Sequence, residues 1–96
     1  MADKKRTRVK GSYLYYKDKP LVRENDTICY GYYEDGCILI FEIMSHTNVD
    51  GIDVPKAVLI QIINTENGEI LKQSQKEGLF EAFNYGMFWY ENLLNK

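Results

Sequence analysis

Glu42 is the first of three kinds of side chain here that could do acid–base or nucleophilic chemistry. It stands among aliphatic residues, and a carboxyl group buried without a partner has a raised pKa and can act as an acid or a base. Lys17, Arg23 or a lysine on a neighbouring strand would instead pair with a half-exposed carboxylate. We expect such a pair, because the spacing places no second carboxylate beside Glu42 to complete a catalytic couple.

His46, the only histidine, and two cysteines are the other candidates. A nucleophile must lie beside its base, but Ser45 should point to the opposite face of a strand, and Cys29 should lie about four residues farther along the sheet. Cys29 and Cys37 match neither a zinc site nor a secreted disulfide framework, so we expect two free thiols. Glycine-rich phosphate loops do not occur in the sequence. The sequence therefore predicts no enzyme, no metal and no cofactor.

Charge divides the chain into two parts. Residues 1–23 carry eight Lys or Arg against two Asp, whereas residues 24–96 carry four against twelve acidic residues. Residues 1–10 contain almost no apolar side chain and are predicted to be a flexible basic arm, followed by one domain over 11–96. Such an arm with exposed tyrosines admits single-stranded nucleic-acid binding as an alternative function. Its contacts would be Lys4, Lys5, Arg6, Arg8, Lys10, Tyr13, Tyr15 and Lys17.

Three Asx-Gly dipeptides, at 35–36, 50–51 and 67–68, predict tight hairpin turns in an antiparallel sheet. A two-residue turn at 50–51 pairs Ile43 with Val58, and one at 35–36 pairs Ile28 with Ile43. Both registers turn the same side of the shared strand inward. The predicted core face comprises Ile28, Tyr30, Tyr32, Leu39, Phe41, Ile43, Val58, Ile60 and Ile62.

The elements read as an α+β fold, in which a twisted antiparallel meander of five to six strands packs on one C-terminal helix. Ser74 and Glu77 match a capping box, which predicts a helix over about 75–95, although Gly78 would allow a start one turn later. Its apolar stripe comprises Leu79, Phe83, Gly86, Tyr90, Leu93 and Leu94. The strands are expected at about 12–17, 20–24, 27–33, 37–46, 52–65 and 69–73.

Apolar residues also occur outside the predicted core, on the second face of the sheet and on the outer side of the helix. The second face of the sheet is aliphatic, apart from Glu42 and Gln61, where a face exposed to water should alternate to polar residues. The N-terminal strands, a second copy of the chain or another partner would cover it. Aromatic residues on the outer side of the helix form a further candidate contact surface. The candidate interface residues are Ile38, Ile40, Met44, Leu59, Ile63, Tyr85, Phe88 and Trp89.

These features predict a small non-enzymatic protein-interaction module, homodimeric or bound to another protein. The longest apolar run, residues 37–41, is far shorter than the roughly 18 residues that cross a bilayer, so we expect a cytoplasmic protein without membrane contact. The abundance of Lys, Asn, Ile and Tyr is typical of low-GC bacterial genomes. A small-molecule pocket near Tyr30, Tyr32 and Tyr90 is a third possibility, which no convergent set of polar residues supports.

Overall fold

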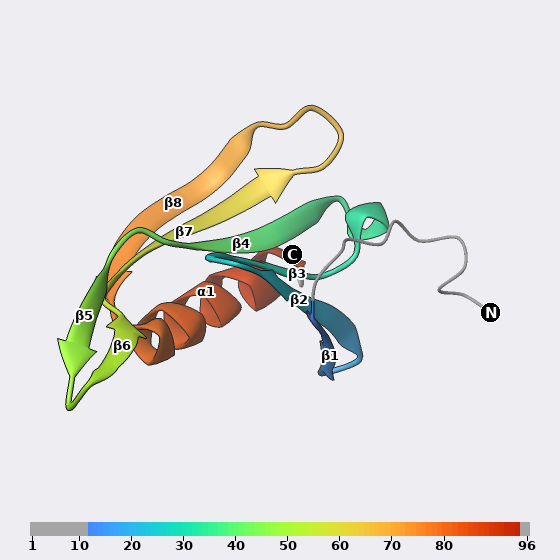
Figure 1. The fold of residues 1–96 in the computed structure, drawn as a ribbon. Coiled ribbons are helices and arrows are strands. Elements are labelled where there is room, and N and C mark those ends of the chain that lie inside the picture. The colour runs from blue at the N-terminus through green and yellow to red at the C-terminus, as the bar shows by residue number, and fades with distance from the viewer. Residues whose placement is uncertain (1–11, 95–96) are drawn as a thin grey trace.

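The computed structural model describes residues 12–94, and side chains from residue 14 onward. A six-stranded antiparallel sheet in the order β1-β2-β3-β4-β7-β8 packs on one C-terminal helix, α1, so the predicted α+β fold is confirmed. A two-stranded ribbon, β5-β6, extends from one end of the sheet (Figure 1). The elements are β1 (Ser12–Tyr16), β2 (Lys19–Glu24), β3 (Thr27–Tyr30), β4 (Cys37–Ile43), β5 (His46–Val49), β6 (Ile52–Pro55), β7 (Ala57–Asn64), β8 (Ile70–Glu77) and α1 (Leu79–Leu94).

The register predicted around the turn at Asp50 and Gly51 is confirmed, because Ile43 faces Val58 across β4 and β7. Both turn residues have positive φ, as a type I′ turn requires. The predicted strands 37–46 and 52–65 are nevertheless each interrupted, at 44–45 and at 56. Pro55, the last residue of β6, has no backbone N–H to donate to a neighbouring strand. The β5–β6 ribbon extends past the part of the sheet that α1 covers.

The register predicted from Asp35 and Gly36 is wrong by two residues. Ile28 faces Phe41 rather than Ile43, because the connection is longer than a two-residue turn. β3 ends at Tyr30, Gly31 bends the chain with φ 109°, and a short 3₁₀ helix at Tyr33–Asp35 follows. A shift of two keeps every side chain on its predicted face, so the predicted core is buried except for Tyr32, which lies beyond the end of β3 and is half-exposed.

The predicted capping box is wrong, and the helix begins about one turn after residue 75, the later start that Gly78 was expected to allow. Ser74 and Glu77, expected as a capping box, belong to β8, which continues to Glu77 as the partner of Ala57. The chain turns at Gly78, whose φ is 85°, and α1 begins at Leu79. The Gly78 N–H donates to the Lys56 carbonyl at 2.6 Å and its carbonyl accepts from the Ala82 N–H at 3.1 Å, so one glycine joins the sheet ladder to the helix.

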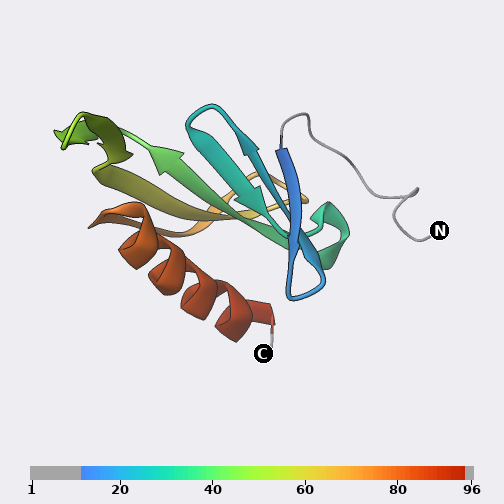
Figure 2. The same cartoon turned by 60° about the horizontal axis from the view of Figure 1, so that its bottom comes forward.

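α1 lies along one side of the curled sheet (Figure 2). All six residues of its predicted apolar stripe pack on the core, and Ala82 and Met87 are buried beside them. Aromatic rings fill the interface. Phe41 stacks on Phe83 with ring centroids 5.7 Å apart, and Tyr30 meets Tyr90 edge to face at 5.5 Å. Edge-to-face and offset ring contacts of this kind add to the burial of their apolar area.

Candidate interaction surfaces

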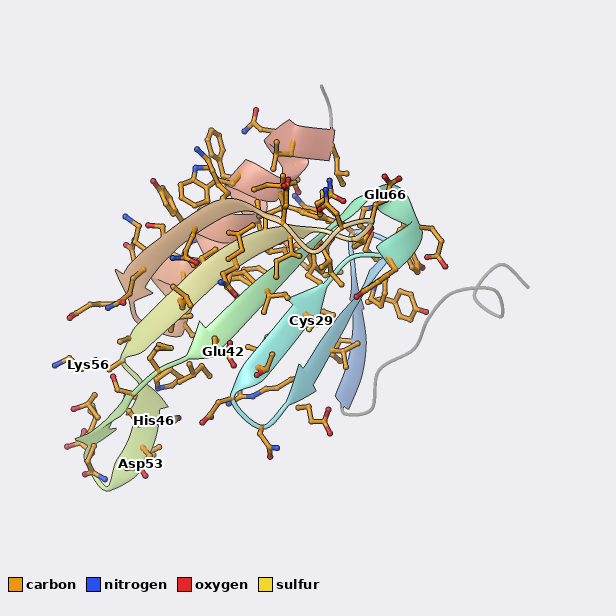
Figure 3. The ribbon with its side chains drawn as sticks, turned by 90° about the horizontal axis from the view of Figure 1, so that it is seen from above. Cys29, Glu42, His46, Asp53, Lys56 and Glu66 are labelled. Carbon is orange, nitrogen blue, oxygen red and sulfur yellow. The ribbon has the colours of Figure 1, made fainter. Side chains whose placement is uncertain are left out.

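The sheet face opposite α1, hereafter the outer face, carries by register the aliphatic residues expected there. Figure 3 labels Cys29 and Glu42 on this face. Ile38 is buried, and Ile40, Leu59 and Ile63 are half-buried. Cys29 lies on the same face, between Val22 of β2 and Ile40 of β4. Four of the five predicted interface residues on the sheet thus share one face. Met44 is 58% exposed but follows the end of β4.

Two pairs of polar residues on the outer face are joined by hydrogen bonds. The Thr27 hydroxyl donates to Glu42 Oε2 at 3.0 Å, and Gln61 Nε2 donates to Gln73 Oε1 at 2.9 Å. The partner expected for Glu42 was a cation, and this prediction is wrong. Lys17 pairs with Glu91 at 2.9 Å, and Arg23 Nε donates to the Asn25 carbonyl at 3.0 Å. Both interruptions of the aliphatic surface therefore have neutral, local partners.

The aromatic side of α1 is divided rather than forming one patch. Tyr85 and Trp89 lie together with ring centroids 4.2 Å apart, and two lysines of β8 cover them. Lys76 Nζ is 4.1 Å from the Tyr85 centroid and Lys72 Nζ is 4.7 Å from the Trp89 centroid. Phe88 stands apart and is 63% exposed. The sequence pattern missed Phe80, which is 78% exposed, although the same wheel places it beside the apolar stripe.

The residues of the nucleic-acid alternative are only partly within the structure. Lys4, Lys5, Arg6, Arg8 and Lys10, together with the predicted arm, lie outside the described residues. Tyr13 is placed only as a backbone position in β1. Tyr15 is exposed, and Lys17 is engaged with Glu91. The described residues do not bring this set together, and nucleic-acid binding stays a prediction.

The candidates for catalysis lie apart. His46 faces Pro55 in the ribbon, and its Nε2 is 3.5 Å from Asp26 Oδ1. Ser45 Oγ accepts the Ala57 N–H at 3.2 Å, which is a contact with the backbone of β7. Over residues 14–94, no three His, Cys, Asp or Glu side chains group as metal ligands would. Nothing in this part of the chain assembles a nucleophile with its base.

Both cysteines are free thiols held in their protonated form. Burial raises the pKa of the Cys29 thiol, and the neighbouring Glu42 and Glu24 raise it further. Burial, with Asp35, also raises the pKa of Cys37, against a smaller opposing effect of Lys19. Because the thiolate is the nucleophile, these surroundings make both sulfurs poorly reactive.

A small cavity does lie at the predicted tyrosine position. It encloses about 170 Å³ between the β1–β2 turn and the last turn of α1, and Tyr32 is not part of it. The phenols on its floor are already engaged, since the Tyr30 hydroxyl donates to the Tyr16 carbonyl at 2.7 Å and the Tyr90 hydroxyl donates to the Cys37 carbonyl at 3.4 Å. The cavity is lined by Lys17, Lys19, Tyr30, Tyr90, Glu91 and Leu94.

The described helix, α1, is neither long nor apolar enough to cross a membrane. Comparison with known proteins gives no match, whether to a family model, to a curated protein or to a solved structure. The functional conclusion therefore depends on the surfaces described above.

Proposed function

We propose that this protein is a small, non-enzymatic interaction module that acts as a homodimer, with two copies joined through their outer faces. The observation that carries this proposal is the composition of that face: it is aliphatic across β4 and β7, where the two polar residues that interrupt it, Glu42 and Gln61, are already hydrogen-bonded. We also propose a cytosolic location, which the two free thiols favour, since a reducing compartment preserves them.

The internal hydrogen bonds lower the cost of covering this face. A buried polar group without a partner destabilises an interface by about 1–3 kcal/mol, so unpaired Glu42 and Gln61 would oppose association. Their bonds to Thr27 and Gln73 lie within one copy and would survive when a second copy excludes water. The Glu42 carboxylate lies two residues from Ile40, which places it toward the border, where water can still reach its second oxygen.

Charge favours a second copy as the occupant. By register, the outer face of the described strands carries Glu24, Glu42 and Glu77 toward one end of the sheet, and neither Lys nor Arg. Ile38 and Ile63 lie toward the other end. A two-fold axis perpendicular to the strands would lay the acidic end of each copy over the aliphatic end of its mate. Like charges would then be separated and the aliphatic centres would meet around Ile40.

The size of the face limits the affinity. Six strands about 4.8 Å apart and about six residues long project onto roughly 600 Å² per copy, or about 1,200 Å² for the pair. That is the lower end of standard interfaces. The central strands alone would be too small, so the flanking strands β1 and β8 must contribute. We expect a dimer that forms at micromolar concentrations.

Sedimentation equilibrium of the full chain tests the proposal. Ile40→Glu would place a charge at the centre of the interface and is expected to give monomers at concentrations where the unmodified protein is dimeric. Phe88→Glu makes the same kind of change on the outer side of α1 and serves as the matched control. Leu59→Glu is a second variant on the outer face, and circular dichroism checks that each variant is folded.

The alternatives give different results. A dimer lost in Phe88→Glu and kept in both outer-face variants would assign the interface to the helix. An unmodified protein that stays monomeric at high micromolar concentration would refute the homodimer.

A further inference from the structure

β8 is an edge strand whose outward backbone groups have no partner in the sheet (Figure 1). Hydrogen bonds in an antiparallel strand alternate between its two neighbours. Met44 N–H donates to the Ala57 carbonyl, so the backbone N–H and C=O groups of Ala57 point toward β4 and those of Val58 point toward β8. Lys76 pairs with Val58, so the backbone groups of Lys76 point toward β7. The hydrogen bond from Gly78 N–H to the Lys56 carbonyl fits the same alternation. The outward groups are those of Gln73, Gln75 and Glu77.

This edge lacks most of the features that usually protect an edge strand, although it carries the charged side chains of Lys72, Lys76 and Glu77. Proteins block such strands with proline, with bulges, with short length or with charged side chains at the edge. β8 is eight residues long without Pro or Gly, and its register irregularity lies at its beginning, opposite Ile62 and Ile63. The opposite edge, β1, has five residues. β8 therefore offers the longer open template for another strand.

The charge beside this edge is unusual for an acidic domain. Lys72 and Lys76 lie on the α1 side of β8, stacked on Trp89 and Tyr85. The ion pairs among residues 14–94 join other groups, so neither ammonium has a carboxylate partner there. Stacking on a ring leaves the positive charge in place. The backbone positions of the two lysines are four residues apart along the strand, about 13 Å, with the small Ser74 between them.

An added strand would place every second side chain on this side of the sheet, opposite Lys72, Ser74 and Lys76. Acidic residues at the first and fifth positions, with an uncharged residue between them, would complement these three. A second β8 would not, because its own lysines would lie diagonally across from these two. Charge therefore favours an acidic segment from a different chain over a second copy at this edge.

We propose that the β8 edge binds an extended acidic segment of a partner protein, which adds to the sheet as a seventh strand. The backbone of Gln73, Gln75 and Glu77 supplies the ladder, and Lys72 and Lys76 select the acidic side chains. This site uses backbone groups at the β8 edge and lysines on the α1 side of the sheet rather than side chains of the outer face. It is therefore tested independently of the proposed homodimer.

A synthetic peptide, acetyl-Thr-Glu-Thr-Val-Thr-Glu-Thr-amide, is the probe, and the same peptide with both Glu replaced by Lys is its control. Titration followed by amide chemical shifts should show saturable binding of the acidic peptide, with the largest changes in β8, weakening as salt is raised. Gln75→Pro removes one outward N–H without touching the β7–β8 ladder and should weaken binding about fivefold or more. The Lys72→Met, Lys76→Met double variant should weaken it about tenfold.

The decisive comparison is between variants and between ligands. Equal binding of the lysine peptide would refute the charge selection, and unchanged binding in Gln75→Pro would refute strand addition. Absence of saturable binding at millimolar peptide would overturn the site. Binding of a short single-stranded oligothymidine, lost in the double lysine variant while the peptide fails to bind, would assign these lysines to nucleic acid instead. The peptide result does not depend on whether Ile40→Glu gives monomers.

Discussion

Gly86 lies where α1 comes closest to the sheet, and replacing it with alanine is expected to destabilise the fold. An added Cβ would lie 2.8 and 2.9 Å from Cε1 and Cζ of Phe41 and 3.1 Å from Cγ2 of Ile60. The Phe41 ring is fully buried and stacks on Phe83, so it has no free space to enter. The helix would have to move away from the sheet, or the ring would have to leave its rotamer.

Two opposing effects decide whether Gly86→Ala raises or lowers the free energy of unfolding. Alanine in place of glycine inside a helix stabilises by about 1 kcal/mol. Inserting a methyl group into a filled core costs about 1–3 kcal/mol, and here we expect about 2–3 kcal/mol because both Phe41 and Ile60 resist it. We expect Gly86→Ala to lower the free energy of unfolding by about 1–2 kcal/mol in balance. For a domain of this size that corresponds to a fall in Tm of about 4–16 °C.

Urea unfolding followed by Trp89 fluorescence and by circular dichroism measures the effect. Asn84→Ala, on the exposed side of the same helix, is the control, and it should stabilise by a few tenths of a kcal/mol. Phe41→Leu removes the obstructing ring carbons, so the cost of Gly86→Ala should shrink in that background. A Gly86→Ala protein that is more stable by about 1 kcal/mol would refute the close packing described for this contact.

Two further predictions concern groups with raised pKa values. Burial, with Glu91, Tyr16 and Asp18, raises the pKa of Tyr30 to about 12, so its contribution to stability is present below about pH 10 and lost as the pH rises through about 12. Urea titrations over this range should show a smaller alkaline loss for Tyr30→Phe, at a cost of about 1 kcal/mol at neutral pH, and an alkaline loss of the same size in both proteins would contradict the role of Tyr30. Cys29 should react with iodoacetamide more slowly than a peptide cysteine and faster in Glu42→Gln, and equal rates in both proteins would contradict the electrostatic effect of Glu42.

The sheet was predictable where local turn chemistry and apolar pairing agree. The turn at Asp50 and Gly51 and the pairing of Ile43 with Val58 specify one register, and the structure has it. At Asp35 and Gly36 the dipeptide alone suggested a tighter turn than the chain forms. The bend at Gly31 has a tertiary cause: a Cβ there would collide with the Tyr90 hydroxyl, from a helix that follows 48 residues later. A local pattern contains no information on that contact.

The start of the helix shows tertiary structure overriding a local signal. Ser74 and Glu77 satisfy the spacing of a capping box, yet both residues pair with β7, Ser74 opposite Ile60 and Glu77 opposite Ala57. The strand continues until Gly78, where positive φ lets the chain leave the sheet. Because the predicted strand ended at 73, the stacking of Lys76 on Tyr85 could not be foreseen, and the basic edge was missed.

The two proposed surfaces are compatible in one assembly because they use different parts of the sheet. Stacking two outer faces involves side chains that point away from α1, whereas strand addition uses backbone groups at the β8 edge and side chains on the α1 side. A dimer joined by a two-fold axis would leave both edges open, so each dimer would offer two sites. A partner carrying two acidic segments would then bind the dimer more tightly than the Ile40→Glu monomer, although each site is unchanged. Equal affinity of a two-segment partner for the dimer and the monomer would mean that the two surfaces do not operate together.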